Sequence, residues 1–378
     1  MNGFNKAARL FLTMKIDPWG SELIRDYEPL FKEFGLQHVA GEMRERFKEN
    51  RGFRRGIVFA HRGFDEYVKA ADEGKRVAVM SGIKPSSEFH LGSKLTAEEI
   101  IFVQKEFAAK AFYCVADNEA LADNGMGYDE TAPLAVENVA DLLALGLDAG
   151  NAFVYKQSAC LPVLNFAQLA ARRTTMATLE ALYGHQNLAL YLSVLTQAGD
   201  ILQPLFAENG FERVVVPVGI DQDPHIRFSR DLASKMDYPL PAATFHRFFR
   251  ALNGETKMSK RDPDSMLALS DSAEDVKRKV SKALTGGRAT VEEQEKLGAE
   301  WRKCVVYELM LFHFEEDDKA LDEMRRDCET GNIMCGECKL KRIKKIQDYL
   351  KKHQEKKKKM LSKAEELLEA APCGCGRE

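Results

Sequence analysis

The sequence predicts an α/β protein in which a doubly wound parallel sheet is followed by an all-helical region. Short runs rich in β-branched and aromatic residues alternate with helical apolar spacing between residues 76 and 218. Strands that alternate with helices pair in parallel, because each helix crosses back over the sheet before the next strand begins. Beyond Pro263 the strand pattern stops and helical spacing continues. The helices after this point therefore form a separate region.

Each expected element has its own pattern in the sequence. Strands are expected at 76–80, 111–115, 152–155 and 213–218. Helices are expected in the sheet region at 91–107, 134–147, 163–183 and 188–203, and in the helical region at 273–285, 300–314, 316–329 and 337–370. We expect an N-terminal extension at 1–70 packed on a sheet domain at 71–265, which has a helical insertion around 163–203, and a helical domain at 266–378 with a basic C-terminal helix.

The composition is that of an ordinary soluble protein. Charged residues make up 30% and hydrophobic residues 45% of the 378 residues. The sequence shows neither an apolar run of about 18 residues, which a membrane span needs, nor a secretory leader. We therefore expect a cytoplasmic protein.

The net charge of −3 is distributed unevenly along the chain. From Lys339 to Met360, eleven Lys or Arg residues oppose Asp348 and Glu355, a surplus of nine that leaves −12 for the remainder. A small net charge argues against binding nucleic acid over the whole surface. The basic run is either a solvated helix face or a helix that faces RNA.

Polar clusters follow three of the expected strands. The segment 85–90 follows the first strand, 117–119 follows the second and 219–223 follows the last. In an open parallel sheet the carboxyl ends of the strands form the ligand crevice, so these clusters are expected to converge there.

A short polar run, KMSKRDP, extends from Lys257 to Pro263 and is too short and too close to glycine to belong to the core. Lys257 and Lys260 are three residues apart, so in a tight turn both ammonium groups can reach one polyanion. Ser259 adds a hydroxyl group. We interpret the run as a mobile phosphate clamp, with a solvated basic turn as the alternative.

The cluster after the first strand suits a phosphate group. Ser86 and Ser87 stand where a helix would be capped, and His90 falls in or near the first helical turn. Free amide groups and the positive helix end bind anions, and His90 adds a donor. A capping serine with a structural histidine is the alternative.

The other clusters carry acids and amides with possible substrate roles. Asp221 suits a ribose hydroxyl, the amides of Gln222 and Gln197 can fix polar atoms of a second substrate, and Glu119 could hold an ammonium group. Each of them taken singly is as often a satisfied surface or capping residue.

Four cysteines, Cys304, Cys328, Cys335 and Cys338, lie with 23, 6 and 2 residues between them. Four thiols this close together in a cytosolic chain favour a tetrathiolate site, holding either zinc or a 4Fe-4S iron-sulfur cluster. The alternative is that Cys304 is a buried apolar residue and the others are incidental. Cys373 and Cys375 could supply a ligand instead.

These residues carry a resemblance to a known class of enzymes. PSSEFHLGS resembles the His-x-Gly-His signature of class I aminoacyl-tRNA synthetases, and KMSKR resembles their Lys-Met-Ser-Lys-Ser loop, in the same order. Five further segments resemble the tryptophanyl enzymes, especially those of archaeal and eukaryotic type: GIDQDPHIRFSRDLA, KIDPW, RRGIVFAHR, GGRATVEEQ and FEEDDK. The resemblance extends from about residue 15 to residue 360.

The resemblance implies a Rossmann-type catalytic domain, a helical anticodon-binding domain and a homodimer with helices around 163–203 at the contact. It also implies ligation of tryptophan to tRNA(Trp) through an adenylate, with ATP and Mg²⁺. The residues implied as catalytic are His90, Lys257, Ser259 and Lys260. Those implied to bind ATP are Pro85, Ser86, Ser87, His90, Gly92, Ser93, Gly219, Asp221, Lys257, Met258 and Lys260.

The implied tryptophan site includes two departures from the family pattern. Glu119, Gln197 and Gln222 match the acid and the two amides, but Met80 and Cys114 stand where eukaryotic relatives use Tyr and Gln for the indole N–H. Neither side chain is a good acceptor, so the indole needs another acceptor, which the sequence does not identify.

The two signature motifs depart from the pattern as well. Ser93 replaces the second histidine and Arg261 stands where the common loop has Ser. Ser93 can still donate to a phosphate or ribose oxygen, so we expect activity to survive. The alternatives are a tyrosyl-tRNA synthetase, a catalytically silent RNA-binding paralogue and a nucleotidyltransferase that does not act on tRNA.

The cysteine spacing resembles that of some tryptophanyl synthetases that hold a 4Fe-4S cluster, with one more residue in the long interval. The cluster is therefore preferred to zinc. The basic run from Lys339 is then expected to lie near the tRNA, where phosphate contacts position the nucleic acid.

Overall fold

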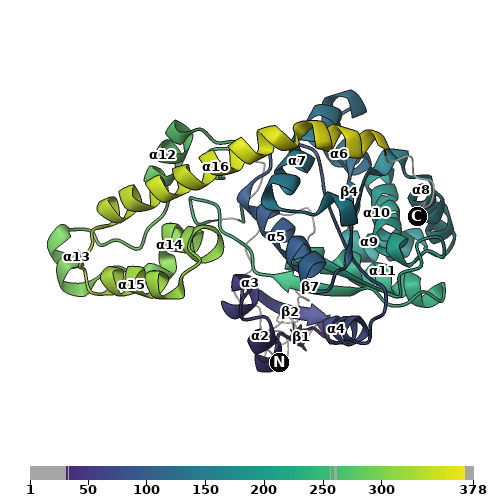
Figure 1. The fold of residues 1–378 in the computed structure, drawn as a ribbon, viewed down its shortest axis with the longest axis horizontal. Helices are drawn as coiled ribbons and strands as arrows, with labels where there is room; N and C mark the ends of the chain where they lie inside the picture. The colour runs from purple at the N-terminus through teal and green to yellow at the C-terminus, as the bar shows by residue number, and fades with distance from the viewer. Residues whose placement is uncertain (1–30, 33, 256, 259–261, 371–378) are drawn as a thin grey trace, which may run out of the picture.

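The structure, a computed structural model, describes residues 31–370 apart from 33, 256 and 259–261. Within these residues one seven-stranded sheet has the order β1-β2-β7-β6-β3-β4-β5 (Figure 1). Its strands are β1 (Gln37–His38), β2 (Val58–Arg62), β3 (Val77–Ile83), β4 (Lys110–Val115), β5 (Ala152–Lys156), β6 (Arg213–Gly219) and β7 (Ala242–His246). The five strands from β7 to β5 are parallel, whereas β1 and β2 are antiparallel to their neighbours.

The four strands expected from the sequence are confirmed as β3, β4, β5 and β6. Strand β7 was not expected, because its residues AATFH lack the β-branched alternation that marks the other strands. Strand β2 pairs with β7, so the segment before residue 71 completes the edge of the sheet and does not merely pack on it. The KIDPW segment lies outside the described residues.

Helices cover both faces of the sheet. Those of this region are α2 (Gly41–Arg46), α3 (Arg51–Arg54), α4 (Phe64–Asp72), α5 (Leu91–Glu106), α6 (Asp117–Asn124), α7 (Tyr128–Leu145), α8 (Leu161–Arg172), α9 (Met176–Tyr183), α10 (Leu188–Leu202) and α11 (Asp223–Lys235). Helices α4, α5 and α7 pack on one face and α8 to α11 on the other.

Side chains of the central strands alternate between these two layers. Val77 and Val79 belong to the core under α5 and α7, whereas Ala78 and Met80 belong to the core under α10. Both faces are buried, so the strands are continuous apolar runs. The same alternation places Met80 and Cys114 on the α10 face.

The helical region consists of α12 (Ala273–Lys282), α13 (Val291–Leu297), α14 (Val305–Leu309), the π-helical turn η6 (Met310–Phe314), α15 (Asp318–Glu329) and α16 (Cys335–Ala370). The expected helices are confirmed, with two differences. The one expected at 163–183 is divided into α8 and α9, and the one expected at 300–314 is divided into a 3-10 turn, α14 and η6. Helix α13 was not expected. Among the described helices, none is long and apolar enough to cross a membrane.

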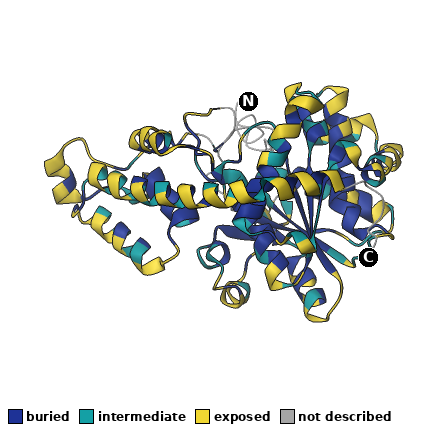
Figure 2. Cartoon of the chain, turned by 45° about the horizontal axis from the view of Figure 1, so that its top comes forward, coloured by how far each residue is buried: buried dark blue, intermediate teal, exposed yellow. Residues whose placement is uncertain are grey.

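Helix α16 joins the two regions. Its 36 residues extend over about 54 Å, from the helical region to the outer side of α7 (Figure 1). Asp141 of α7, which is 1% exposed, accepts from His353 Nε2 at 2.8 Å and from Lys357 Nζ at 2.8 Å. One side of α16 is buried and the other is exposed (Figure 2), and the exposed side carries lysines of the basic run, including Lys344, Lys351 and Lys358.

A second contact between the two regions lies beneath α5, the helix that begins at the His90 motif. Lys94 has no exposed surface and donates from Nζ to Glu98 Oε1 at 2.6 Å. Burial lowers the pKa of Lys94 to about 8. Glu98 also pairs with Arg51 of α3, which reaches Glu316 just before α15. The helical region is therefore held directly against α5.

Candidate active site

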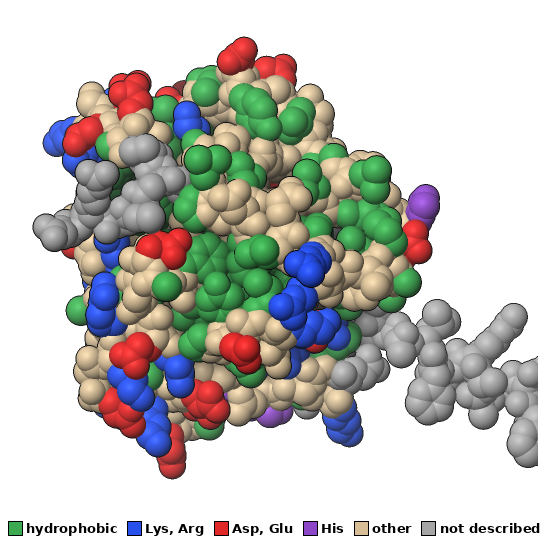
Figure 3. Space-filling model, turned by 90° about the vertical axis from the view of Figure 1, so that its right-hand side faces the viewer, with side chains coloured by type: hydrophobic (Ala, Val, Ile, Leu, Met, Phe, Trp, Pro, Cys, Tyr) green, Lys and Arg blue, Asp and Glu red, His purple; other side chains and the backbone are tan. Residues whose placement is uncertain are grey.

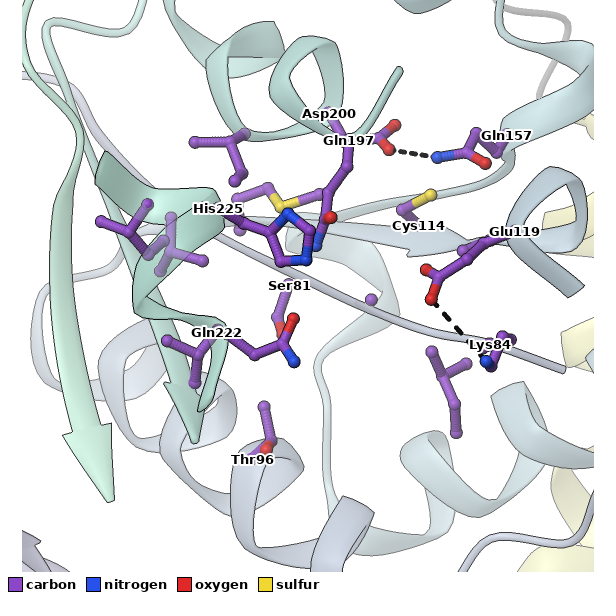
Figure 4. A pocket seen from close by; sticks show the side chains of 18 of the residues that line it. Ser81, Lys84, Thr96, Cys114, Glu119, Gln157, Gln197, Asp200, Gln222 and His225 are labelled. Carbon is purple, nitrogen blue, oxygen red and sulfur yellow. Dashed lines mark hydrogen bonds and ion pairs between the residues drawn. The ribbon is translucent and has the colours of Figure 1, made fainter. Parts of the chain in front are cut away.

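A pocket of about 240 Å³ opens at the carboxyl ends of β3, β4 and β6, on the α10 face. Figure 4 shows the side chains from these strands and from α10 and α11 that surround it. The polar ones are Ser81, Lys84, Thr96, Cys114, Glu119, Gln157, Gln197, Asp200, Gln222 and His225. All five side chains expected at the amino-acid site line this pocket: Met80, Cys114, Glu119, Gln197 and Gln222.

Asp200 of α10 is the acid in this pocket that the sequence interpretation missed. It is 2% exposed and accepts from Tyr155 Oη at 2.8 Å and from Gln157 Nε2 at 2.5 Å. Burial raises the pKa of Asp200 to about 7, against the lowering effect of these bonds and of the Cys114 thiol. A lone carboxylate within the apolar run of α10 was the signal that could have identified it.

The wall of the pocket also carries a charged pair. Glu119, in the first turn of α6, lies 3.7 Å from Lys84 Nζ, which also pairs with Asp123 (Figure 4). Gln222 donates from Nε2 to Asp221 Oδ2 at 3.3 Å. Glu119 and Gln222 therefore face the cavity from different sides, Glu119 from α6 and Gln222 from the turn after β6 (Figure 4).

His225 on α11 is another wall residue that was not expected. Its ring stacks on Tyr183 with centroids 5.0 Å apart, and burial lowers the pKa of His225 to about 4. The imidazole is therefore neutral at physiological pH, so this side chain brings a polar surface without a positive charge.

The phosphate motif differs from expectation in its capping residue. His90, not Ser86 or Ser87, caps α5, because its Nδ1 accepts from the amides of Gly92 at 3.0 Å and Ser93 at 3.4 Å. Ser86 and Ser87 lie in the loop before it, after the buried Pro85. The imidazole accepts these helix-end bonds because Nδ1 is a good acceptor when Nε2 carries the proton.

The lysine loop lies next to this motif. A Cβ atom on Gly92 would be 3.9 Å from the carbonyl oxygen of Met258. The side chain of Met258 is 5% exposed and packs in the core, so the expectation that the whole run lies outside the core is wrong for this residue. Its amide donates to the carbonyl of Phe249 at 2.9 Å, which anchors the loop.

Lys257 already has an anionic partner at the crevice. Its ammonium group lies 2.6 Å from Asp221 Oδ2, and both side chains are mostly buried. Lys257 and Asp221, expected to contact different parts of one nucleotide, are therefore adjacent. Ser259, Lys260 and Arg261 lie outside the described residues.

The four cysteines line one small cavity between α14, α15 and the start of α16, with Ile333, Met324 and Tyr307 around them. Burial, and then the neighbouring cysteines, raise the pKa of Cys328 to about 12. In the described part of the chain, no three or more His, Cys, Asp or Glu side chains are arranged to hold one metal ion. Cys373 and Cys375 lie outside that part.

Comparison with known proteins agrees with this geometry. Residues 72–351 match the family described as tRNA synthetases class I (W and Y). The tryptophan--tRNA ligase of Aeropyrum pernix is 40% identical over 94% of this chain and 98% of its own, and that of Hyperthermus butylicus is 39% identical over 94% and 98%. The crystal structure of the tryptophanyl-tRNA synthetase from Aeropyrum pernix superposes with a TM-score of 0.87, covering 93% of this chain and 98% of that one.

The parallel sheet with its two adjacent signature motifs and these matches define a class I aminoacyl-tRNA synthetase. Eight relatives that are 33–42% identical over 86–94% of this chain are tryptophan--tRNA ligases. The chain belongs to the tryptophan--tRNA ligase family.

Proposed function

We propose that this protein ligates tryptophan to tRNA(Trp) in two steps. The tryptophan carboxylate attacks the α-phosphorus of ATP, an oxygen–phosphorus bond forms, and the bond to the departing pyrophosphate breaks. A terminal ribose hydroxyl of the tRNA then attacks the adenylate and releases AMP. The observation that carries the proposal is the single pocket in which Glu119, Gln197 and Gln222 lie together with Asp200.

Asp200 supplies the indole acceptor that Met80 and Cys114 cannot. A carboxylate offers about four lone-pair positions, of which Tyr155, Gln157 and the Cys114 thiol use three. The indole Nε1 is a donor only, so it fits the position that remains. Glu119, Gln197 and Gln222 are assigned to the ammonium and carboxylate groups of tryptophan.

The nucleotide is assigned to the crevice between the two signature motifs. His90, Gly92 and Ser93 at the start of α5 would face the phosphates, and Lys257 would exchange Asp221 for a phosphate oxygen. Asp221 is then free to accept from a ribose hydroxyl. Mg²⁺ bound with ATP neutralises phosphate charge. Ser259 and Lys260 keep the catalytic roles that the family pattern implies.

Pyrophosphate exchange tests this function directly. The protein with ATP, Mg²⁺ and labelled pyrophosphate should form labelled ATP when tryptophan is present. Tyrosine should support at least 100-fold less exchange, since a buried acceptor that loses its donor costs about 1–3 kcal/mol beyond the misfit of the ring. Exchange that prefers tyrosine, or no exchange with either amino acid, contradicts the proposal.

Replacing Gly92 by alanine should lower the exchange rate about tenfold with little change in stability. The new Cβ would lie 2.8 Å from Cε1 and 2.9 Å from Nδ1 of His90, so the imidazole must turn away. Losing the cap costs about 1 kcal/mol, and the better helix propensity of alanine returns a similar amount.

Gly41→Ala is the matched control, because a Cβ at the start of α2 meets nothing within 4 Å. Exchange rates and the free energy of unfolding in urea are measured for both variants. A Gly92→Ala protein as active as the wild type would show that the orientation of the His90 ring is not used.

The four cysteines are proposed to hold a 4Fe-4S cluster. Support comes from their spacing and from the one cavity they share. The spacing resembles that of tryptophanyl synthetases that hold such a cluster, which favours it over zinc. A four-iron cluster takes one thiolate at each iron, so bound there it would cross-link α14, α15 and α16.

Anaerobically purified protein should be brown and contain about four iron atoms per chain. Cys328→Ser and Cys338→Ser should lose most of the iron, because three thiolates hold the cluster weakly. Cys114→Ser, a buried cysteine outside this cavity, should retain it. Colourless protein with one zinc per chain would favour the zinc alternative, and protein without metal would favour the structural role of Cys304.

A second copy of the chain is the proposed partner of the α8 to α10 face. Figure 3 shows apolar side chains gathered on this side of the molecule. The large exposed ones are Leu161, Leu169, Met176, Leu188 and Leu192, which are between 48% and 74% exposed. Apolar patches of this kind mark association surfaces. Light scattering should report a mass twice that of the 42.6 kDa chain.

We also propose a role for each domain, the domain boundaries and the location of the protein. The sheet domain is catalytic, and the helical domain with the basic face of α16 contacts the anticodon arm of the tRNA. The boundaries proposed are those at 70 and 265, and the location proposed is the cytoplasm. The position of α16 across α7 supports a direct path from tRNA contacts to the catalytic domain.

A further inference from the structure

A histidine and a glutamate form a buried pair beneath the crevice. His246 is the last residue of β7 and Glu99 lies on α5; they are 7% and 4% exposed. His246 Nδ1 is 2.7 Å from Glu99 Oε1. Thr244 Oγ1 donates to Glu99 Oε2 at 3.1 Å, so both carboxylate oxygens are engaged.

The pair determines which edge of the imidazole faces the site. The carboxylate can only accept, so Nδ1 carries the proton that is shared with Glu99. In the neutral ring Nε2 then has a free lone pair and acts as an acceptor.

Nε2 is directed to the turn that follows β6. The register of the sheet sets His246 beside Gly219, and a Cβ on Gly219 would lie 3.6 Å from Nε2. The same point is 2.6 Å from Asp221 Oδ1 and 3.7 Å from the ring of Phe248. Any side chain at residue 219 would therefore fill a corner bounded by an imidazole acceptor, a carboxylate and an aromatic ring.

Gly219 separates this corner from the amino-acid pocket, whose wall it also forms. Asp221 at the corner holds Lys257 at 2.6 Å. Two acceptors side by side match a group that carries O–H or N–H donors, and the Lys257 ammonium beside them is left for a phosphate oxygen. In ATP such donors belong to the ribose hydroxyls and the adenine amino group.

We propose that His246 recognises the nucleoside part of ATP, with Nε2 accepting a hydrogen bond from a donor of the adenosine, and that Glu99 is the positioning residue that holds the required tautomer. The inference rests on the proposed function and names a further binding group for its nucleotide. Both residues also lie near a signature motif in the chain. Glu99 is nine residues after His90 on α5, and β7, which ends at His246, precedes the lysine loop.

Nucleotide analogues test the role of Nε2. His246→Phe keeps a ring of similar size and removes the acceptor, so the Kd for ATP should rise about tenfold, the effect of one hydrogen bond of about 1.4 kcal/mol. The Kd for tryptophan should not change. Isothermal titration with ATP, 2′-deoxy-ATP, 3′-deoxy-ATP and ITP then identifies the donor. The wild type should bind one of these analogues more weakly than it binds ATP. His246→Phe should bind that analogue and ATP equally well.

Glu99→Gln tests the tautomer. The amide can donate to Nδ1, which moves the ring proton to Nε2 and makes that atom a donor facing another donor. ATP should therefore bind at least tenfold more weakly than it binds the wild type. The analogue that lacks the donor should bind this variant as well as ATP does. If the pair is only structural, Glu99→Gln should leave the ratio of the affinities for ATP and for that analogue unchanged.

His353→Phe is the matched control, because it breaks a buried histidine–carboxylate pair of the same kind, with Asp141 on α7. It should lower stability and leave all four nucleotide affinities unchanged. His246→Asn, which can place a carbonyl acceptor near the same corner, should recover part of the ATP affinity if His246→Phe folds poorly.

The inference is overturned if His246→Phe binds every analogue as wild type does, or if it weakens tryptophan as much as ATP. These titrations need no amino-acid activation, so they separate the two proposals. Wild-type protein that binds ATP but performs no exchange with tryptophan contradicts the proposed function alone. Unchanged titrations of the His246 variants alongside active wild type contradict this inference alone.

Discussion

Asp200→Ala should raise the KM for tryptophan about 100-fold in pyrophosphate exchange while changing the KM for ATP less than twofold. The substitution leaves the indole N–H without an acceptor in a closed pocket, and it also leaves Tyr155 Oη and Gln157 Nε2 without theirs. An unpaired buried donor costs about 1–3 kcal/mol, and 1.4 kcal/mol corresponds to a factor of ten.

Asp200→Asn is the conservative control. Its carbonyl oxygen still accepts, and Gln157 can turn its amide, whose Oε1 has no hydrogen-bond partner within the described residues. Its KM for tryptophan should therefore rise less than tenfold. An alanine variant that binds tryptophan as tightly as wild type does would remove Asp200 from the indole site.

The pH dependence of tryptophan binding follows from the same side chain. Burial raises the pKa of Asp200 to about 7, so below pH 7 the carboxyl group is mostly protonated and competes with the indole as a donor. The KM for tryptophan should rise as the pH falls through 7, by up to tenfold per unit, and level off above pH 8. Asp200→Asn should show no such slope.

Lys257→Ala should lower the rate of tryptophanyl-adenylate formation by a factor of about 100 to 1000. The lysine neutralises phosphate charge that develops in the transition state, and groups of this kind contribute on the order of 3–4 kcal/mol. Its removal also leaves the Asp221 carboxylate, now 2.6 Å from the ammonium group, facing the triphosphate. The rate of adenylate formation is measured in single-turnover experiments, and the Kd for tryptophan is measured separately, so that effects on catalysis and on binding are distinguished.

Lys235→Ala is the control for this variant, since Lys235 is an exposed lysine paired with Asp231 at 2.6 Å on α11. It should leave the rate unchanged. Equal losses in adenylate formation and tryptophan binding for Lys257→Ala would make the loop a binding element without a catalytic role. We propose a similar effect on the rate for Lys260, which lies outside the described residues.

The fold was predictable where burial on both faces leaves a continuous apolar run. Strands β3, β4 and β6 are of this kind, and each was expected at nearly its observed bounds. Strand β7 was not, because two alanines and a histidine carry little pattern of their own and the strand depends on pairing with β2 and β6. Local sequence cannot show a pairing made by distant segments.

The candidate site was likewise predictable only in part. The motifs around His90 and Lys257 stand out because chemistry requires unusual residue types in a fixed order. Asp200 did not stand out, because its surroundings along the chain are those of an apolar helix, and only packing brings Tyr155 and Gln157 to it from β5 and the turn that follows it. Met258 was misjudged for a related reason, since its burial depends on core residues far away in sequence.

The sequence by itself determined the class of fold, the order of its elements, the two signature motifs and the family to which they belong, because each of these is carried by residues close together in the chain. The tertiary structure alone decided which groups share one pocket, which residue caps α5 and where the Glu99 and His246 pair is directed. Those features depend on distances between side chains from different strands and helices, and these distances are established only when the sheet and its covering helices pack.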